Sequence, residues 1–215
     1  DGNTVANSGR FISYSGVRVT GGTDNAILGN SIFDNGDANT GLGINLGAVG
    51  VTGNDSGDGD TGPNNLQNFP VLSTAVTSGS NTTISGSFNS TASTTFRIEF
   101  FANRFGTANN TNGEGRIYLG AVQVTTDSSG NANINALLNN IRLAAGDRVT
   151  ATATEVLGTN QYGSTSEMSA NIVAQSYIIA VTSTTDVADG NTSNIANLAN
   201  SAGSDGVISL REAIT

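Results

Sequence analysis

Seven short segments between Phe69 and Ala174 alternate apolar and polar residues, and this pattern constrains the fold more than any other feature of the chain. Alternation with a period of two is typical of strands that bury one face. Turn signals such as Gly79-Ser80-Asn81 and Ser129-Gly130-Asn131 separate the segments. The expected strands are VLSTAVT (71–77), TTISGSF (82–88), TTFRIEFFAN (94–103), RIYLGAVQVTT (116–126), NANINALL (131–138), DRVTATATE (147–155) and SEMSANIV (166–173).

Seven strands in about a hundred residues predict an immunoglobulin-like β-sandwich over residues 69–174. Within TTFRIEFF, alternate residues point to opposite faces, so we expect the apolar set to share one face and the charged set to share the other. The apolar set is Phe96, Ile98 and Phe100, and the charged set is Arg97 and Glu99. The loop NRFGTANNTNGEG (103–115) is a candidate ligand loop, although a loop rich in Gly and Asn is more often only a permissive connection.

Residues 1–50 are internally repetitive. NTVAN (3–7) recurs as NAILGN (25–30), and GVRV (16–19) recurs as GLGINL (41–46), at offsets of 22 and 25 residues. A period in the low twenties with Asn and Gly at the corners predicts coils of a parallel β-helix, in which each coil stacks on the next. Ordinary β-hairpins with Asn-Gly turns are the alternative. The residues expected to point into the coils are Val5, Ile27, Ile32, Ile44 and Leu46.

Residues 51–68 form a linker in which Asp55, Asp58 and Asp60 stand among Gly, Asn and Ser. Alternating carboxylates on a Gly-rich loop resemble a Ca²⁺ site, because oxygens from one turn can converge on the ion. A solvated polar linker is the alternative. The loop contains no complete EF-hand pattern, so Ca²⁺ is a candidate cofactor that rests on the carboxylates alone.

Residues 175–215 combine one apolar strand with two helix signals. We expect YIIAVTS (177–183) to form the strand and residues 195–199 to lie in a short amphipathic helix. Ser209 and Glu212 then form a capping box, in which each side chain accepts a hydrogen bond from the backbone N–H of the other. A helix this short needs a surface to pack on, because nucleation costs more than its few hydrogen bonds return.

The segment DGVISLRE (205–212) also matches the back half of an EF-hand loop, with Gly, Ile and Glu at the required separations. Its front half lacks two carboxylates, so Ca²⁺ binding here would need help from the preceding acidic turn. The candidate ligands of this region are Asp186, Asp189, Asp205 and Glu212. The capping box is the simpler explanation of the glutamate.

The chain carries 17 Asp and Glu residues against 8 cationic residues, all of them Arg, and its net charge is −9. This balance argues against nucleic acid and anionic membranes as partners. The absence of His and Cys excludes Ser-His-Asp and Cys-His catalysis, and the absence of Lys excludes a Schiff base. There is no apolar run long enough for membrane insertion, no signal peptide and no initiating Met, so we expect a piece of a longer protein.

The segment DGVISLREAI (205–214) resembles the SLREAI signature of the CSLREA-type domain of large bacterial surface and secreted proteins, with Ile208 where that family has Cys. YIIAVTSTTDVADG (177–190) is similar to the strand that precedes the signature. NAILGNSIFDN (25–35) with GLGINLG (41–47) resembles the closing coils, and NDSGDGDTGPNNLQNFPVL (54–72) resembles the connection to an immunoglobulin-like module. The resemblance implies a right-handed parallel β-helix and no catalytic residues.

Only about two coils fit in residues 1–50, whereas solenoids generally need three or more repeats to bury a continuous core. We therefore expect both ends of the stack to be open, and residues 175–215 to cap the coils of a neighbouring copy. The expected assembly residues are Val5, Val17, Ile27, Ile44, Tyr177, Ile178, Ile179, Ile208 and Leu210.

The predicted fold is therefore all-β, with coils over 1–50, a linker over 51–68, a sandwich over 69–174 and a cap over 175–215. The favoured function is non-catalytic. We expect an extracellular or cell-surface module of a head-to-tail filament, sheath or adhesin stalk, whose partners are copies of the same module.

Two other functions compete with this interpretation. A carbohydrate-binding or adhesive sandwich would hold a surface glycan, with Tyr118, Tyr162 and Phe105 as its few aromatic candidates. A polysaccharide lyase or hydrolase is less favoured, because its candidate carboxylates sit beside turns on only two coils. Those carboxylates are Asp24, Asp34 and Asp37.

Overall fold

The computed structural model is all-β apart from short helices, and it describes residues 2–8, 15–36, 41–104, 112–177, 184, 188–204 and 207–214. The strands are β1 (Thr4–Ala6), β2 (Val17–Val19), β3 (Ser31–Phe33), β4 (Ile44–Leu46), β5 (Val71–Ser78), β6 (Asn81–Asn89), β7 (Thr95–Asn103), β8 (Ile117–Thr125), β9 (Asn131–Leu138), β10 (Arg148–Gly158), β11 (Gln161–Thr165), β12 (Ile172–Val173) and β13 (Gln175–Tyr177). The helices are the 3-10 helix η1 (Pro63–Leu66), α1 (Ile195–Asn200) and α2 (Leu210–Ile214).

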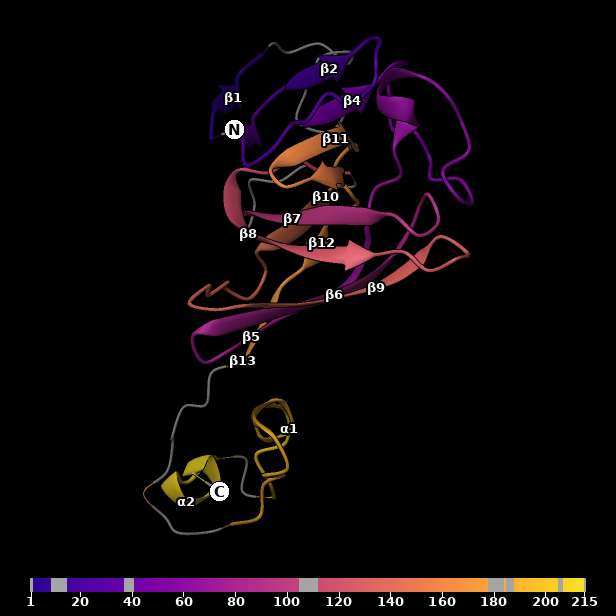
Figure 1. The fold of residues 1–215 in the computed structure, drawn as a ribbon. Coiled ribbons are helices and arrows are strands. Elements are labelled where there is room, and N and C mark those ends of the chain that lie inside the picture. The colour runs from indigo at the N-terminus through magenta and orange to yellow at the C-terminus, as the bar shows by residue number, and fades with distance from the viewer. Residues whose placement is uncertain are drawn as a thin grey trace.

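Strands β1 to β4 form two parallel two-stranded sheets, in which β1 pairs with β3 and β2 pairs with β4. Thr4 lies opposite Ser31 and Val17 lies opposite Ile44, so both pairs are 27 residues apart. This N-terminal segment (the described residues of 2–50) therefore stacks two similar layers (Figure 1). We name the layer with β1 and β2 the outer layer, and the layer with β3 and β4 the inner layer.

The offsets of 22 and 25 residues that the sequence suggested are wrong. NTVAN (3–7) lies beside NSIFD (30–34) and not beside NAILGN (25–30). The side-chain oxygen of Asn30 accepts hydrogen bonds from the backbone and side-chain nitrogens of Asn3, at 3.0 and 3.1 Å, and these bonds help to fix the register. GVRV (16–19) pairs with the GINL part of GLGINL, so the second repeat was recognised but placed two residues early.

The other strands form two larger sheets that share one hydrophobic core. One sheet has the order β13-β5-β6-β9, and the other has the order β11-β10-β7-β8 with β12 also paired to β10. The predicted apolar face of β7 is confirmed and lies in the core, because Phe96, Ile98 and Phe100 are at most 1% exposed. Glu99, on the opposite face, is also buried. The Phe96 ring meets Phe88 of β6 edge-on, with 4.9 Å between the ring centroids, and so joins the two sheets.

Six of the seven expected strands are present as single strands. The prediction for SEMSANIV is wrong over most of its length, because only its last two residues form a strand, β12, and Ala170 makes a single isolated bridge to Asn112. The strand that pairs with the far side of β10 is β11, whose sequence QYGST shows no apolar alternation. Ser166 and Ser169 still follow β10, with their N–H groups donating to the carbonyl oxygens of Ala153 and Ala151 at 2.9 Å.

The inner layer of the N-terminal segment packs on the sheet that contains β7. Ile32 and Ile44, each 1% exposed, form one apolar cluster with Phe101 of β7 and with Met168. The N–H of Ile32 donates to the carbonyl of Gly115 at 2.8 Å. The expectation of two open ends is therefore wrong for the inner layer, because the larger sheet covers it. Among the described residues, no strand pairs with the outer edge of β1 or of β2.

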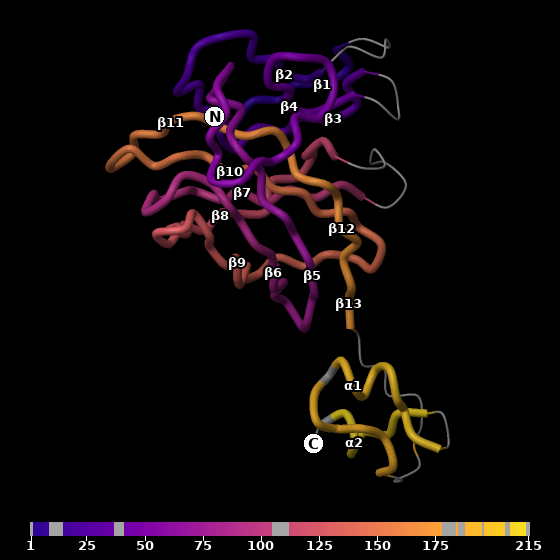
Figure 2. The backbone as a smooth tube through the Cα atoms, turned by 90° about the vertical axis from the view of Figure 1, so that its right-hand side faces the viewer, coloured from indigo at the N-terminus to yellow at the C-terminus, as the bar shows by residue number. Residues whose placement is uncertain are grey.

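The C-terminal helices lie at the other end of the molecule. Figure 2 shows α1 and α2 beyond β13, on the side away from β1 and β2. The N-terminal cap of α1 is Asn194, whose side chain accepts a hydrogen bond from the N–H of Asn197 at 2.9 Å. The predicted strand YIIAVTS (177–183) lies outside the described residues after Tyr177, which ends β13 and pairs with Ser78 of β5.

We predict that Phe101→Ala lowers the free energy of unfolding by about 3–5 kcal/mol, because it leaves a cavity in the cluster that joins the two parts of the chain. Urea unfolding followed by circular dichroism measures this loss. Leu137→Ala on β9 is the control, since Leu137 is 58% exposed and its truncation changes the free energy by less than about 0.5 kcal/mol. A loss below about 1 kcal/mol in Phe101→Ala contradicts the shared cluster.

Candidate functional site

Three buried glutamates hold the N-terminal segment on the larger sheet. Glu99, Glu114 and Glu167 are 0%, 6% and 2% exposed, and each accepts backbone hydrogen bonds from the N-terminal segment or the loop that follows it. The donors are the N–H groups of Gly29 to Glu99 at 2.7 Å, Asn35 to Glu114 at 2.9 Å, Leu46 to Glu167 at 2.8 Å and Thr52 to Glu167 at 2.9 Å. The carboxylates thus satisfy N–H groups that no strand pairs, three of them in loops and one, that of Leu46, at the end of β4.

The three glutamates differ in their charge balance. Glu99 accepts a hydrogen bond from the Nε–H of Arg97 at 2.8 Å, so an ion pair offsets the cost of burying its charge. No described arginine pairs with Glu114 or Glu167. Burial raises the pKa of both carboxyls, and the backbone hydrogen bonds from Asn35 and Leu46 oppose that rise.

A β-bulge places Tyr118 on the face of the larger sheet that contacts the N-terminal segment. Phe100 lies opposite Gly120, and the next residue, Phe101, lies opposite Tyr118, so Leu119 is an extra residue on β8. Regular alternation would put Tyr118 on the core face with Val122. The bulge instead turns Leu119 into the core and Tyr118 toward the N-terminal segment, where its ring packs edge-on against Phe101 at 5.7 Å.

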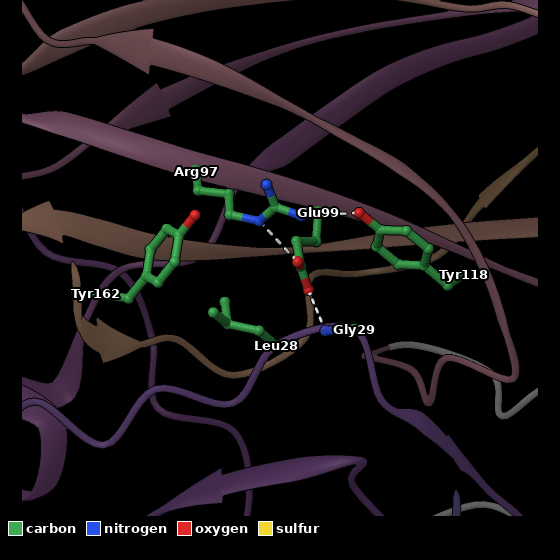
Figure 3. A pocket seen from close by; sticks show the side chains of 6 residues that line it. All are labelled: Leu28, Gly29, Arg97, Glu99, Tyr118 and Tyr162. Carbon is green, nitrogen blue, oxygen red and sulfur yellow. Dashed lines mark hydrogen bonds and ion pairs between the residues drawn. The ribbon is translucent and has the colours of Figure 1, made fainter. Parts of the chain in front are cut away.

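A pocket of about 200 Å³ opens where this face of the sheet meets residues 28 and 29 (Figure 3). Its lining consists of Leu28, Gly29, Arg97, Glu99, Tyr118 and Tyr162. The Nη2 of Arg97 donates to the hydroxyl of Tyr118 at 2.9 Å, and the guanidinium carbon lies 5.9 Å from the centroid of the Tyr162 ring. The pocket therefore brings together two of the three aromatic candidates, while the third, Phe105, lies outside the described residues.

The acidic linker brings its three carboxylates together, with ligand oxygens of Asp55, Asp58 and Asp60 within 4.8 Å of one another. Both oxygens of Asp58 accept hydrogen bonds: its Oδ1 accepts from the N–H of Asn68 at 3.0 Å, and its Oδ2 accepts from Gln67 at 2.5 Å and from Ser90. In contrast, Asp55 Oδ1 and Asp60 Oδ1 are buried and accept no hydrogen bond from the described residues.

The electrostatics of this acidic loop favour a cation. Burial raises the pKa of Asp58 and of Asp60, and the negative charge of Asp55 raises both further. No arginine forms an ion pair with the three carboxylates among the described residues. Carboxylate oxygens that converge without a donor are the ligands that Ca²⁺ prefers, so the residues fit a hard cation.

The C-terminal unit (the described residues of 188–214) uses its carboxylates as acceptors for its own backbone N–H groups. The capping box is confirmed, because Ser209 N–H donates to Glu212 Oε2 at 2.8 Å and Glu212 N–H donates to Ser209 Oγ at 3.3 Å. Glu212 Oε1 also accepts from the N–H groups of Asp189, at 3.0 Å, and Gly190. These hydrogen bonds, the one from Ser209 first, lower the pKa of Glu212. Asp186 and Asp205, the other candidate ligands here, lie outside the described residues.

The expected assembly residues fall into different environments. Val5, Val17 and Ile27 pack at the edge of the apolar cluster and are partly buried. Ile44 is only 1% exposed, so its contacts are within the chain. Ile208 is 9% exposed in the C-terminal unit, whereas Leu210 on α2 is 62% exposed. Tyr177 ends β13, and Ile178 and Ile179 lie outside the described residues.

No protein-family model matches the chain, and no curated protein matches it. In the part of the chain that the structure describes, no helix is long and apolar enough to span a bilayer.

We predict that the free energy of unfolding rises as the pH falls from 7.5 to 5. Glu114 and Glu167 have pKa values above their ordinary 4.5, so their contribution to stability is present below pH 4.5 and is lost as the pH rises through the raised pKa. Glu212 acts in the opposite direction, but its lowered pKa confines that effect to pH values below about 4.5. Urea titrations at several pH values measure the slope.

Glu167→Gln removes one of these titrating groups and is expected to flatten the slope. Its matched control is Glu212→Gln, which removes a carboxyl that does not titrate between pH 5 and 7.5 and should leave the slope unchanged. A slope that stays the same in Glu167→Gln, or a stability that falls between pH 7.5 and 5, contradicts the assignment.

Proposed function

We propose that this chain is a non-catalytic, extracellular structural module that joins copies of itself head to tail in a filament, sheath or adhesin stalk. The observation that carries the proposal is the asymmetry of the N-terminal segment. Its inner layer is fixed to a large sheet, whereas the outer edges of β1 and β2 have no strand partner among the described residues. The helices α1 and α2 lie at the opposite end of the molecule (Figure 2).

The finer fold assignment belongs to the same proposal. The two layers with their 27-residue offset are interpreted as two coils of a right-handed parallel β-helix. The strand orders β5-β6-β9 and β11-β10-β7-β8 suit an immunoglobulin-like sandwich. The resemblance of residues 205–214 to the SLREAI signature of bacterial surface and secreted proteins supports this interpretation and the extracellular location.

The backbone of β1 supports a strand-pairing contact. The carbonyl of Asn3 and the N–H of Asn7 bond to the inner layer, so the alternation of a strand turns the backbone groups of Thr4 and Ala6 outward. Such an edge readily accepts another strand. We assign this edge to residues 177–214 of a neighbouring copy, whose Leu210 side chain is 62% exposed and offers an apolar contact.

Ca²⁺ in the acidic loop is part of the proposal as a stiffening element. The loop follows β4 and precedes β5, so it connects the two parts of the module along the chain. Asp58 already ties it to Ser90 beyond the end of β6. A cation held by Asp55, Asp58 and Asp60 would neutralise carboxylates that now repel one another, and would hold the module in one shape.

We predict that the full chain forms rods with an axial repeat of one module, seen by negative-stain electron microscopy and as a large species in light scattering. Thr4→Pro removes an outward N–H without touching the bonds to β3, and deletion of residues 178–215 removes the proposed partner strand. Both changes are expected to leave monomers, whereas Leu137→Ala should still form rods.

Urea unfolding of Thr4→Pro checks that the fold is retained. Two outcomes contradict head-to-tail assembly: a wild-type chain that stays monomeric at high concentration, or rods that persist in Thr4→Pro.

We predict that Ca²⁺ at about 100 times its Kd raises the melting temperature of the chelator-treated protein by about 5–10 °C, because ligand that binds only the folded state adds about 2.7 kcal/mol. Asp60→Asn should abolish most of this shift in differential scanning fluorimetry. Asp24→Asn is the matched control, since Asp24 is exposed and its positive φ suits Asn. Equal shifts in the two variants would exclude the acidic loop as the site.

A further inference from the structure

The pocket between Tyr118 and Tyr162 plays no part in the proposed assembly. The buried carboxylate in its wall nevertheless has a hydrogen-bond donor for each of its oxygens. Glu99 lies at its base, 0% exposed, and is held by Arg97 on one oxygen and by the N–H of Gly29 on the other. Figure 3 shows the two tyrosines on either side of this pair, with Leu28 along the wall formed by the N-terminal segment. The pocket thus combines a fixed polar floor with aromatic sides.

The aromatic sides are well placed for a ligand with apolar C–H groups. Tyr118 is 40% exposed, and its packing against Phe101 fixes the orientation of its ring. Tyr162 stands on β11 at the far side of Arg97. Rings of this kind present an apolar body and a polar hydroxyl, a combination that suits the C–H faces and hydroxyl edges of sugars.

The polar groups of the pocket retain unused hydrogen-bonding capacity. Arg97 has five N–H donors, and the described residues accept from only Nε and Nη2. The Tyr118 hydroxyl accepts from Arg97 and keeps its own proton to donate. The Tyr162 hydroxyl has no partner among the described residues. Burial and the nearby Glu99 carboxylate raise the pKa of Tyr118, so its hydroxyl stays protonated at neutral pH.

The charge of the pocket selects among ligands. The Arg97 guanidinium is neutralised by Glu99 at 2.8 Å, so no unpaired positive charge is left for a carboxylate or phosphate. The whole chain carries a net charge of −9, which further disfavours anions such as nucleotides. We propose that this pocket binds one pyranose residue of a neutral glycan, stacked between Tyr118 and Tyr162 and hydrogen-bonded to Arg97.

Saturation-transfer difference NMR on the full chain tests the proposal, because the method reads weak binding on a monomer or on a filament. The neutral probes are methyl β-D-glucopyranoside, methyl β-D-galactopyranoside, methyl α-D-mannopyranoside and N-acetylglucosamine. The anionic probe is methyl β-D-glucuronide. We expect saturable binding of at least one neutral probe with a Kd of roughly 1 mM, which is about −4 kcal/mol, and weaker binding of the glucuronide.

The variants separate stacking from nonspecific contact. Tyr118→Ala and Tyr162→Ala are expected to raise the Kd at least about tenfold, whereas Tyr162→Phe keeps the ring and changes the Kd by less than about threefold. Leu137→Ala, on the other sheet, should bind as wild type does. Circular dichroism and urea unfolding confirm that each variant is folded.

Three results would overturn the proposal: no saturable signal from any neutral probe, binding that persists in both alanine variants, or tighter binding of the glucuronide than of every neutral probe. None of these results bears on rod formation, which is measured separately. The experiments therefore test the glycan pocket and the structural function independently.

Discussion

The four backbone hydrogen bonds that Glu99, Glu114 and Glu167 accept from the N-terminal segment and the loop after it hold this molecule together. Corner loops expose N–H groups that no neighbouring strand can pair, and docking on a sheet would bury those groups without a partner at a cost of about 1–3 kcal/mol each. A carboxylate offers several acceptor positions, so Glu167 serves both Leu46 and Thr52. The tight docking of two irregular layers therefore depends on side chains of the larger sheets and their connections.

This docking explains how two layers persist where a solenoid would need more repeats. Phe101 and Met168 supply the apolar surface that a third layer would otherwise provide, and Ile32 and Ile44 are buried against them. Gly43 permits the close approach, because a Cβ there would lie only 2.8 Å from the Met168 sulfur. Among the described residues, no strand pairs with the outer edges of β1 and β2, so the assembly that we propose would need a single kind of contact there.

Local patterns in the sequence predicted local structure well, but they predicted few long-range partners: the pairing of GVRV with GLGINL was recognised two residues out of register. Alternation identified β5 to β10, and the spacing of Ser209 and Glu212 identified the capping box, because both signals lie within a few residues. The docking glutamates could not be foreseen, since their donors lie 70, 79 and 121 residues away. The repeat was misplaced because several Asn residues fit a corner equally well. The bulge that turns Tyr118 outward had one available signal, a glycine inside a strand at residue 120.

The carboxylates of this acidic chain differ in the groups that balance their negative charge. Glu99 is balanced by Arg97, which leaves the adjoining pocket neutral. Glu114 and Glu167 are balanced by neutral hydrogen-bond donors and by no described arginine, so the contact between the N-terminal segment and the larger sheet is sensitive to pH. Asp55 and Asp60 each have one oxygen that is buried and accepts no hydrogen bond from the described residues. The divalent ion that we propose would complete this last set, because one ion satisfies several oxygens at once where a single N–H would satisfy one. Local pairing of the carboxylates therefore underlies both proposals, a neutral ligand beside the Arg97–Glu99 ion pair and a cation beside Asp55 and Asp60.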